Sequence, residues 1–275
     1  MPTFVGAKCP NCGGDLQVPS DRTSVKCMYC SGDVIVKQAI MSAATGNVQN
    51  WMKLAKAAVD AGNYEETLTN ANKVLEVEPT NHAAWLFKAV GSGWLSNLRN
   101  CRLEEMVSNM KQAIECAPRD DEKDVKVFAA EKLEEAAAAY YLLSRKHFLE
   151  FVTVDGAWPE FLEQANAALT ALDAAHNIDP QNAGVIRDGV KLMTELIQGV
   201  AYNDTDHYGH PIRRVHRVAA QFSQRLTELK AQYETKLKGL DPSYQTQDVK
   251  VAKVGVAYKV LPVLRLFNRL LKHYS

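Results

Sequence analysis

Most of the chain has the spacing of hydrophobic residues that is typical of α-helices. From about residue 48 onward, apolar residues recur every three or four positions, and short polar segments containing Pro or Gly interrupt them. In the second half, the pattern predicts helices at 122–154, 158–177, 183–202, 211–239 and 249–273. The sequence therefore predicts a mainly α protein, an α-solenoid of antiparallel helical hairpins.

The first 38 residues follow a different pattern, in which apolar and polar residues alternate as in short β-strands. The alternating apolar residues are Leu16, Val18, Val25, Val34 and Val36. We therefore expect a small β module at 1–38, a linker at 39–47, and a helical body at 48–242.

Four prolines mark the ends of predicted helices. Each follows an apolar helical segment and is itself followed within a few residues by a polar residue that can cap a new helix. These prolines are Pro79, Pro118, Pro180 and Pro242. They divide the body into hairpins of unequal length.

The first hairpins carry a recognisable repeat. Trp51, Leu54, Gly62, Tyr64, Val74 and Pro79 stand in the order found in a tetratricopeptide repeat. Trp85 follows Trp51 by 34 residues, which is the period of that family. The body resembles this family most closely over 48–118, and the resemblance implies a curved solenoid with a concave groove for a partner protein or peptide.

The resemblance also implies which residues would line the groove. The corresponding positions on the first helices of the hairpins are Met52, Lys56, Val59, Leu86, Val90 and Trp94. Only Lys56 suits a carboxylate-gripping groove, so these residues favour an apolar groove for a partner helix. The alternative is ordinary helix packing, which is the stronger interpretation for Leu86 and Trp94 because large apolar residues at helical spacing are usually buried.

Four cysteines near the N-terminus have the spacing of a metal site. Cys9 and Cys12, and then Cys27 and Cys30, form two Cys-x-x-Cys pairs, and such pairs supply the four thiolates that Zn²⁺ prefers at tetrahedral corners. The module resembles a zinc ribbon, which implies one structural Zn²⁺. A redox pair is the alternative, but it needs a βαβ context that the pattern does not show.

The tips of the two cysteine turns are the surface that such a module displays. Met28 and Tyr29 lie between the second pair of cysteines and are candidate partner contacts. The module carries Lys8, Arg22, Lys26 and Lys37 against Asp15, Asp21 and Asp33. This near balance suits phosphate binding poorly.

Charge is unevenly distributed although Lys plus Arg and Asp plus Glu both total 32. Residues 39–206 carry 15 basic and 25 acidic residues, whereas 207–275 carries 13 basic and 4 acidic ones. The C-terminal region, 243–275, predicts a basic amphipathic helix, with Leu264, Phe267, Leu270 and Leu271 on one face. The default expectation is that this helix caps the solenoid by covering the open face of the last hairpin.

Two alternatives remain for the basic region. It could make the protein a nucleic-acid-associated factor, with the zinc ribbon as an accessory, or it could hold the protein on anionic lipid through 249–272. No run of 18 apolar residues and no secretory signal is found, so the sequence predicts a cytoplasmic protein without a transmembrane segment.

Enzyme motifs are not apparent in the sequence. It contains no phosphate loop, nucleophile elbow or zincin motif. His207, His210 and His216 stand near Asp204 and Asp206, but their spacing matches no ligand motif and their role is open. We therefore expect a non-enzymatic protein–protein interaction adaptor or scaffold.

Overall fold

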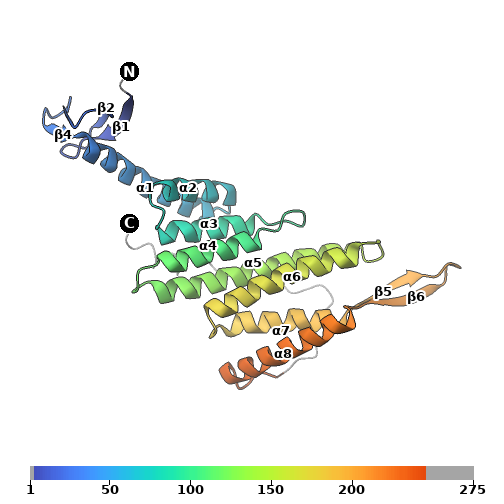
Figure 1. The fold of residues 1–275 in the computed structure, drawn as a ribbon. Coiled ribbons are helices and arrows are strands. Elements are labelled where there is room, and N and C mark those ends of the chain that lie inside the picture. Colours follow the sequence, from blue (N-terminus) through green and yellow to red (C-terminus); the bar gives the residue numbers. More distant parts are fainter. Residues whose placement is uncertain (1–2, 246–275) are drawn as a thin grey trace.

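Residues 3–245 are described by the computed structural model, in which a small β module leads into a stack of helices (Figure 1). The module contains two antiparallel hairpins, which pair β1 (Phe4–Lys8) with β2 (Asp15–Pro19) and β3 (Ser24–Lys26) with β4 (Asp33–Ile35). Val5 lies opposite Val18, and Val25 lies opposite Val34. The alternation in the sequence thus predicted the strands correctly.

Eight helices are found within the described residues. They are α1 (Val36–Asp60), α2 (Tyr64–Val77), α3 (His82–Trp94), α4 (Leu103–Cys116), α5 (Glu122–Glu150), α6 (Ala157–Ile178), α7 (Ala183–Gln198) and α8 (Ala220–Leu240). Neighbouring helices pack as antiparallel hairpins, and each hairpin stacks on the next (Figure 1). The prediction of a mainly α solenoid is confirmed.

The helix ends follow the proline pattern. Asn81 and Asn182 are the N-caps of α3 and α7, and each side-chain oxygen accepts backbone N–H bonds from the first turn. Pro79 and Pro180 stand two residues before these caps, where the preceding helix has ended. A capped start after each proline keeps the hairpins separate.

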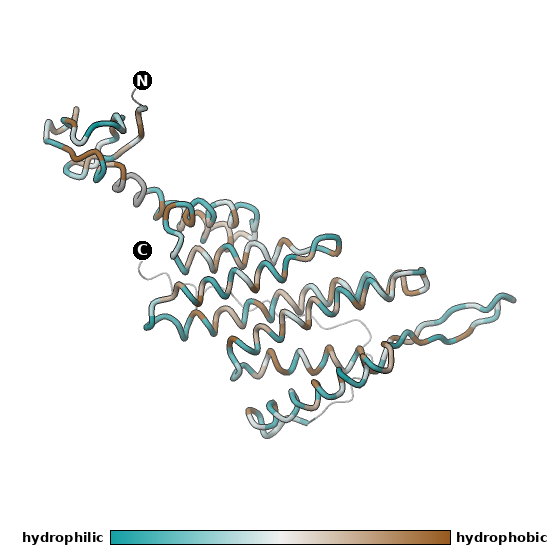
Figure 2. Tube along the Cα trace, in the orientation of Figure 1, coloured by the Kyte–Doolittle hydropathy of each residue, from teal (hydrophilic) through white to brown (hydrophobic). Residues whose placement is uncertain are grey.

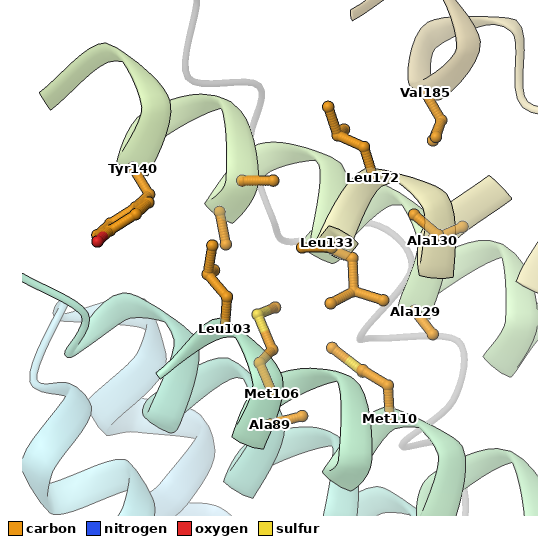
Figure 3. Close-up of a cluster of buried hydrophobic side chains, with 14 of the residues drawn as sticks. Ala89, Leu103, Met106, Met110, Ala129, Ala130, Leu133, Tyr140, Leu172 and Val185 are labelled. Atoms are coloured by element: carbon orange, nitrogen blue, oxygen red, sulfur yellow. The ribbon is translucent and has the colours of Figure 1, made fainter. Parts of the chain in front are cut away.

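The helices share one continuous hydrophobic core because each presents its apolar side to its neighbours. Hydrophobic and hydrophilic residues alternate along the helices of the stack (Figure 2). Met106 and Met110 of α4 extend toward Ala129 and Leu133 of α5 (Figure 3), and all four are fully buried.

The β module has a hydrophobic core of its own, and α1 connects this core to the core of the solenoid. Val36 and Ala39, near the start of α1, are buried with the strands of the module. Met52 and Ala55, farther along the same helix, belong to the core of the solenoid. The residues at 39–47, predicted as a linker, are therefore part of a helix. Their Ala and Met residues favour helix and outweigh the single Gly46.

The predicted helices at 183–202 and 211–239 are wrong where they meet, because residues 200–216 form a projecting β-hairpin instead. α7 ends at Gln198, and β5 (Val200–Thr205) pairs with β6 (Pro211–His216) to form an arm that extends from the stack (Figure 1). Gly199 adopts a φ of +74° between α7 and β5, which a side chain would strain.

The remaining sequence predictions concern the C-terminal end. α8 begins at Ala220, and the predicted helix at 249–273, with nearly all of 243–275, lies outside the described residues. Within residues 3–245, every helix is either too short or too polar to cross a bilayer.

Candidate metal centre and interaction surfaces

The four predicted cysteine ligands converge in the β module. All four Sγ atoms lie within 4.8 Å of one another, and they are the only such group of metal-binding side chains among the described residues. The Sγ atoms of Cys9 and Cys30 are 3.8 Å apart, and those of Cys12 and Cys27 are 3.7 Å apart. A tetrahedral zinc site with Zn–S bonds of about 2.3 Å has sulfur–sulfur edges of about 3.8 Å. The cluster therefore fits a tetrahedral metal ion.

The two cysteine turns have the same backbone hydrogen bonds. In the first, the N–H of Gly13 donates to the carbonyl of Cys9, and the N–H of Cys9 donates to that of Gly14. In the second, Ser31 and Gly32 take the places of Gly13 and Gly14.

The residues that follow the second cysteine of each turn also share a left-handed backbone. The φ angles are +73° at Gly13 and +58° at Ser31. A glycine is absent from this position in the second turn, so Ser31 takes a conformation that is costly for a residue with a Cβ.

Each turn also covers a glycine of the other. The Tyr29 ring lies against Gly14, where a Cβ would be 2.5 Å from Tyr29 Cδ2. In the same way, a Cβ on Gly32 would be 3.0 Å from Asn11 Nδ2. Gly14 and Gly32 thus lie where the tip of the opposite turn packs closely against the backbone, which brings the two turns together.

The electrostatics of the cluster favour a bound cation. Backbone N–H groups of Cys30 and Tyr29 lower the pKa of Cys27 to about 7. The backbone N–H of Gly14 also lowers the pKa of Cys12, but burial and the thiols of Cys9, Cys30 and Cys27 raise it to about 12. Hydrogen bonds among the thiols thus lower the pKa of Cys27 and raise that of Cys12, and a bound divalent cation would stabilise all four as thiolates.

The tips of the cysteine turns are exposed, as a contact surface requires. Met28 is 77% exposed and Tyr29 is 65% exposed, although one side of the Tyr29 ring covers Gly14. Their part in binding a partner stays a prediction.

Most residues predicted to line an apolar groove are buried instead. Met52, Val59, Leu86 and Val90 are at most 9% exposed and belong to the core of the solenoid. This corrects their assignment to an open groove, because stacking of successive hairpins covers the apolar sides of these helices. Leu86 belongs to ordinary helix packing, which was the alternative to a groove position.

Lys56 and Trp94 are the two groove residues that remain partly exposed. The Trp94 ring stacks on Tyr64 at the start of α2, with ring centroids 5.8 Å apart. Burial raises the pKa of Tyr64, and the negative charge of Glu135 on α5 adds to this effect. Tyr64, and with it the aromatic pair, therefore lies near the carboxylate of Glu135 on α5.

Three acidic residues of α5 and one of α7 form a surface that the sequence analysis did not single out. We call Glu131, Glu134, Glu135 and Asp188 the acidic face. All four are partly buried, and burial is the largest cause of the raised pKa values of Glu131, Glu134 and Asp188. The helical spacing of the three glutamates in the sequence could have indicated this surface. Only the structure places Asp188 beside them.

The three histidines near the arm do not form a common site. His216 is at the base, where its ring stacks between Tyr202 and Trp158 with centroid separations of 4.6 and 5.3 Å. Its Nε2 is 2.9 Å from the carbonyl oxygen of Val152 in the α5–α6 turn. His216 therefore attaches the arm to the solenoid.

His207 and His210 lie at the exposed tip of the arm instead. Asp206 organises this tip, because its Oδ1 accepts the backbone N–H groups of Tyr208 and His210, both at 2.9 Å. The tip is therefore a polar turn.

Comparisons with known proteins return distant structural likenesses. Neither a family model nor a curated protein matches the chain. A solved structure of "MamA 41-end from Desulfovibrio magneticus RS-1" is 16% identical, with 73% of this chain and 98% of that chain covered and a TM-score of 0.24. A "Crystal structure of MamA protein" is 13% identical, with 71% and 92% covered and a TM-score of 0.22. Such low scores transfer no function to this chain.

Proposed function

We propose that this protein is a non-enzymatic interaction adaptor, in which a zinc-stabilised module is attached to a helical solenoid that binds a protein partner. The observation that carries the proposal is the stack of helical hairpins, whose side presents an aromatic pair next to an acidic face. Stacked hairpins provide extended surfaces on which peptides or helices can dock.

The role proposed for zinc is structural. Four cysteine ligands complete a tetrahedral shell, so they leave no coordination position for a substrate. Apart from the cysteines, the module buries only a few apolar side chains, such as Leu16, Val18 and Val34. A bound metal would provide the stability that so small a core lacks.

The proposed partner surface combines Trp94, Tyr64 and the acidic face. Aromatic side chains supply contact area with little loss of conformational entropy, and partly buried carboxylates favour a basic partner. We therefore expect a partner segment that carries Lys or Arg.

Affinity capture from the source cells, followed by reconstitution with the purified candidate, tests the proposal. We expect Trp94→Ala together with Glu134→Gln to weaken the reconstituted complex at least tenfold. The paired control is Glu104→Gln with Glu115→Gln, because both carboxylates are exposed on α4. Equal affinity for both variants would exclude this surface, and turnover of a substrate by the purified protein would exclude a purely binding role.

A further inference from the structure

The face of α5 around the acidic residues combines negative charge with exposed apolar surface. Val127, Glu131, Glu134, Ala138 and Leu142 follow one another at intervals of three or four residues, so they share one side of the helix. None of them is fully buried, and the Leu142 side chain is 36% exposed. Within residues 3–245, this side of α5 is therefore only partly covered.

The charges on this surface are only partly neutralised. Lys132 Nζ binds Glu135 Oε1 at 2.7 Å, and Arg187 Nη2 is 3.6 Å from Asp241 Oδ2. Among the described residues, Glu131, Glu134 and Asp188 form no ion pair, although Lys132, Arg187 and Lys191 are close enough to affect their titration. These three carboxylates can therefore form ion pairs with additional basic side chains.

The described chain ends beside this surface. Asp241, the C-cap of α8, pairs with Arg187, the residue next to Asp188. Tyr244 packs against the core of the solenoid and lies near Arg187. The segment that begins at residue 246 therefore starts next to the acidic face.

The composition of this segment complements the surface. Residues 246–275 contain one acidic residue, Asp248, and six basic ones: Lys250, Lys253, Lys259, Arg265, Arg269 and Lys272. Its apolar residues include Leu264, Phe267 and Leu270. Thirty residues span about 45 Å even if they are helical throughout, which is as long as α5.

We propose that residues 246–275 dock within the same chain on the acidic face and on the exposed apolar side of α5. The basic side chains would neutralise Glu131, Glu134 and Asp188, while the apolar ones would cover Ala138 and Leu142. This inference rests on the proposed function, because the segment would occupy the surface assigned to a partner. A partner that uses this surface must then displace the segment.

Carbodiimide cross-linking of the purified full-length protein tests the contact directly. The reagent joins a lysine to a carboxylate only when they touch, and a mixture of ¹⁴N- and ¹⁵N-labelled protein distinguishes links within a chain from links between chains. We expect links from Lys250, Lys253 or Lys259 to Glu131, Glu134 or Asp188 within one chain. Links between chains, or none to these carboxylates, would overturn the proposal.

Limited trypsin digestion tests the dependence on charge. We expect Glu131→Gln, Glu134→Gln and Asp188→Asn together to accelerate cleavage after Arg265 and Arg269 at least fivefold, since the segment is released. The control, Glu104→Gln with Glu115→Gln, should leave the rate unchanged, and circular dichroism checks the fold of each variant. Equal rates for all variants would contradict docking on this face.

A lipid surface is the other destination for a basic amphipathic segment, and flotation with phosphatidylserine vesicles examines it. Docking predicts that the triple variant binds vesicles more tightly than the unchanged protein. Equal binding would count against docking. All three measurements use the purified chain alone, so their failure would leave the partner-capture result of the proposed function unaffected.

Discussion

The Tyr29 ring lies on Gly14, so the tip of one cysteine turn covers the backbone of the other. A Cβ on Gly14 would be 2.5 Å from Tyr29 Cδ2, and the equivalent relationship joins Asn11 to Gly32. The two turns are therefore coupled by packing as well as by the convergence of their four cysteines.

Gly14→Ala tests this coupling. The added methyl group must displace the Tyr29 ring, and we expect a cost of about 1 kcal/mol, or about fivefold weaker zinc binding. Competition with a chromogenic chelator measures the affinity. Gly6→Ala is the control, because a Cβ there meets nothing within 4 Å. If Gly14→Ala weakens binding equally with and without Tyr29→Ala, the two residues are not coupled.

Ser31→Gly should strengthen the site. Ser31 has a φ of +58°, where glycine is not strained, while the greater flexibility of glycine in the unfolded chain offsets part of the gain. We expect a net gain of up to about 1 kcal/mol, measured as a higher zinc affinity. Gly13→Ser, at the equivalent position of the first turn, should have the opposite effect. A lower affinity for Ser31→Gly would contradict the strain at this residue.

Removal of zinc should unfold the β module and leave the solenoid intact. The two hydrophobic cores are separate, and the four cysteines belong to the smaller region. A chelator should release about one zinc ion per chain while most of the far-UV circular dichroism persists. Loss of all helical signal would show that the two parts fold as one unit.

Much of this organisation follows from the sequence. The Cys-x-x-Cys pairs at residues 9–12 and 27–30, the alternation in the first 38 residues and the capped starts after Pro79 and Pro180 are local signals. Each reports a conformation decided by nearby residues. The prediction of an open partner groove was wrong for Met52 and Val90, because helical periodicity identifies an apolar side without showing what will cover it.

His216→Ala should loosen the β5–β6 arm. The mutation removes the ring between Tyr202 and Trp158 and the contact with the Val152 carbonyl, and a two-stranded hairpin has little stability without such support. We expect amide hydrogen exchange in β5 and β6 to accelerate at least tenfold. His207→Ala, at the tip, is the control. Unchanged exchange after His216→Ala would contradict the anchoring role.

Glu134 should make stability depend on pH. Burial raises its pKa from 4.5 to about 7, with Asp188, Glu135 and Glu131 adding to the rise and Arg187 opposing it. The folded state therefore binds a proton more tightly than the unfolded state, so the free energy of unfolding falls as pH rises from about 4.5 to about 7.

Glu134→Gln should remove this contribution. We expect its Tm at pH 8 to exceed that of the unchanged protein by about 2–4 °C, or about 1 kcal/mol after allowing for solvent screening of this partly exposed group. The difference should shrink toward pH 5. Calorimetry across this range, with Glu104→Gln as the control, measures it. The same gain at every pH would exclude titration of Glu134 as its cause.

The sequence by itself determined the cysteine cluster, the helical hairpins and the helix ends before Pro79, Pro118, Pro180 and Pro242, since these depend on spacing and on residues close along the chain. The tertiary structure decided which apolar sides are buried, where the β5–β6 arm projects, and which carboxylates of α5 and α7 meet. It also placed Tyr29 on Gly14, across fifteen positions of sequence. Such contacts depend on how separate elements pack, and no local preference encodes that arrangement.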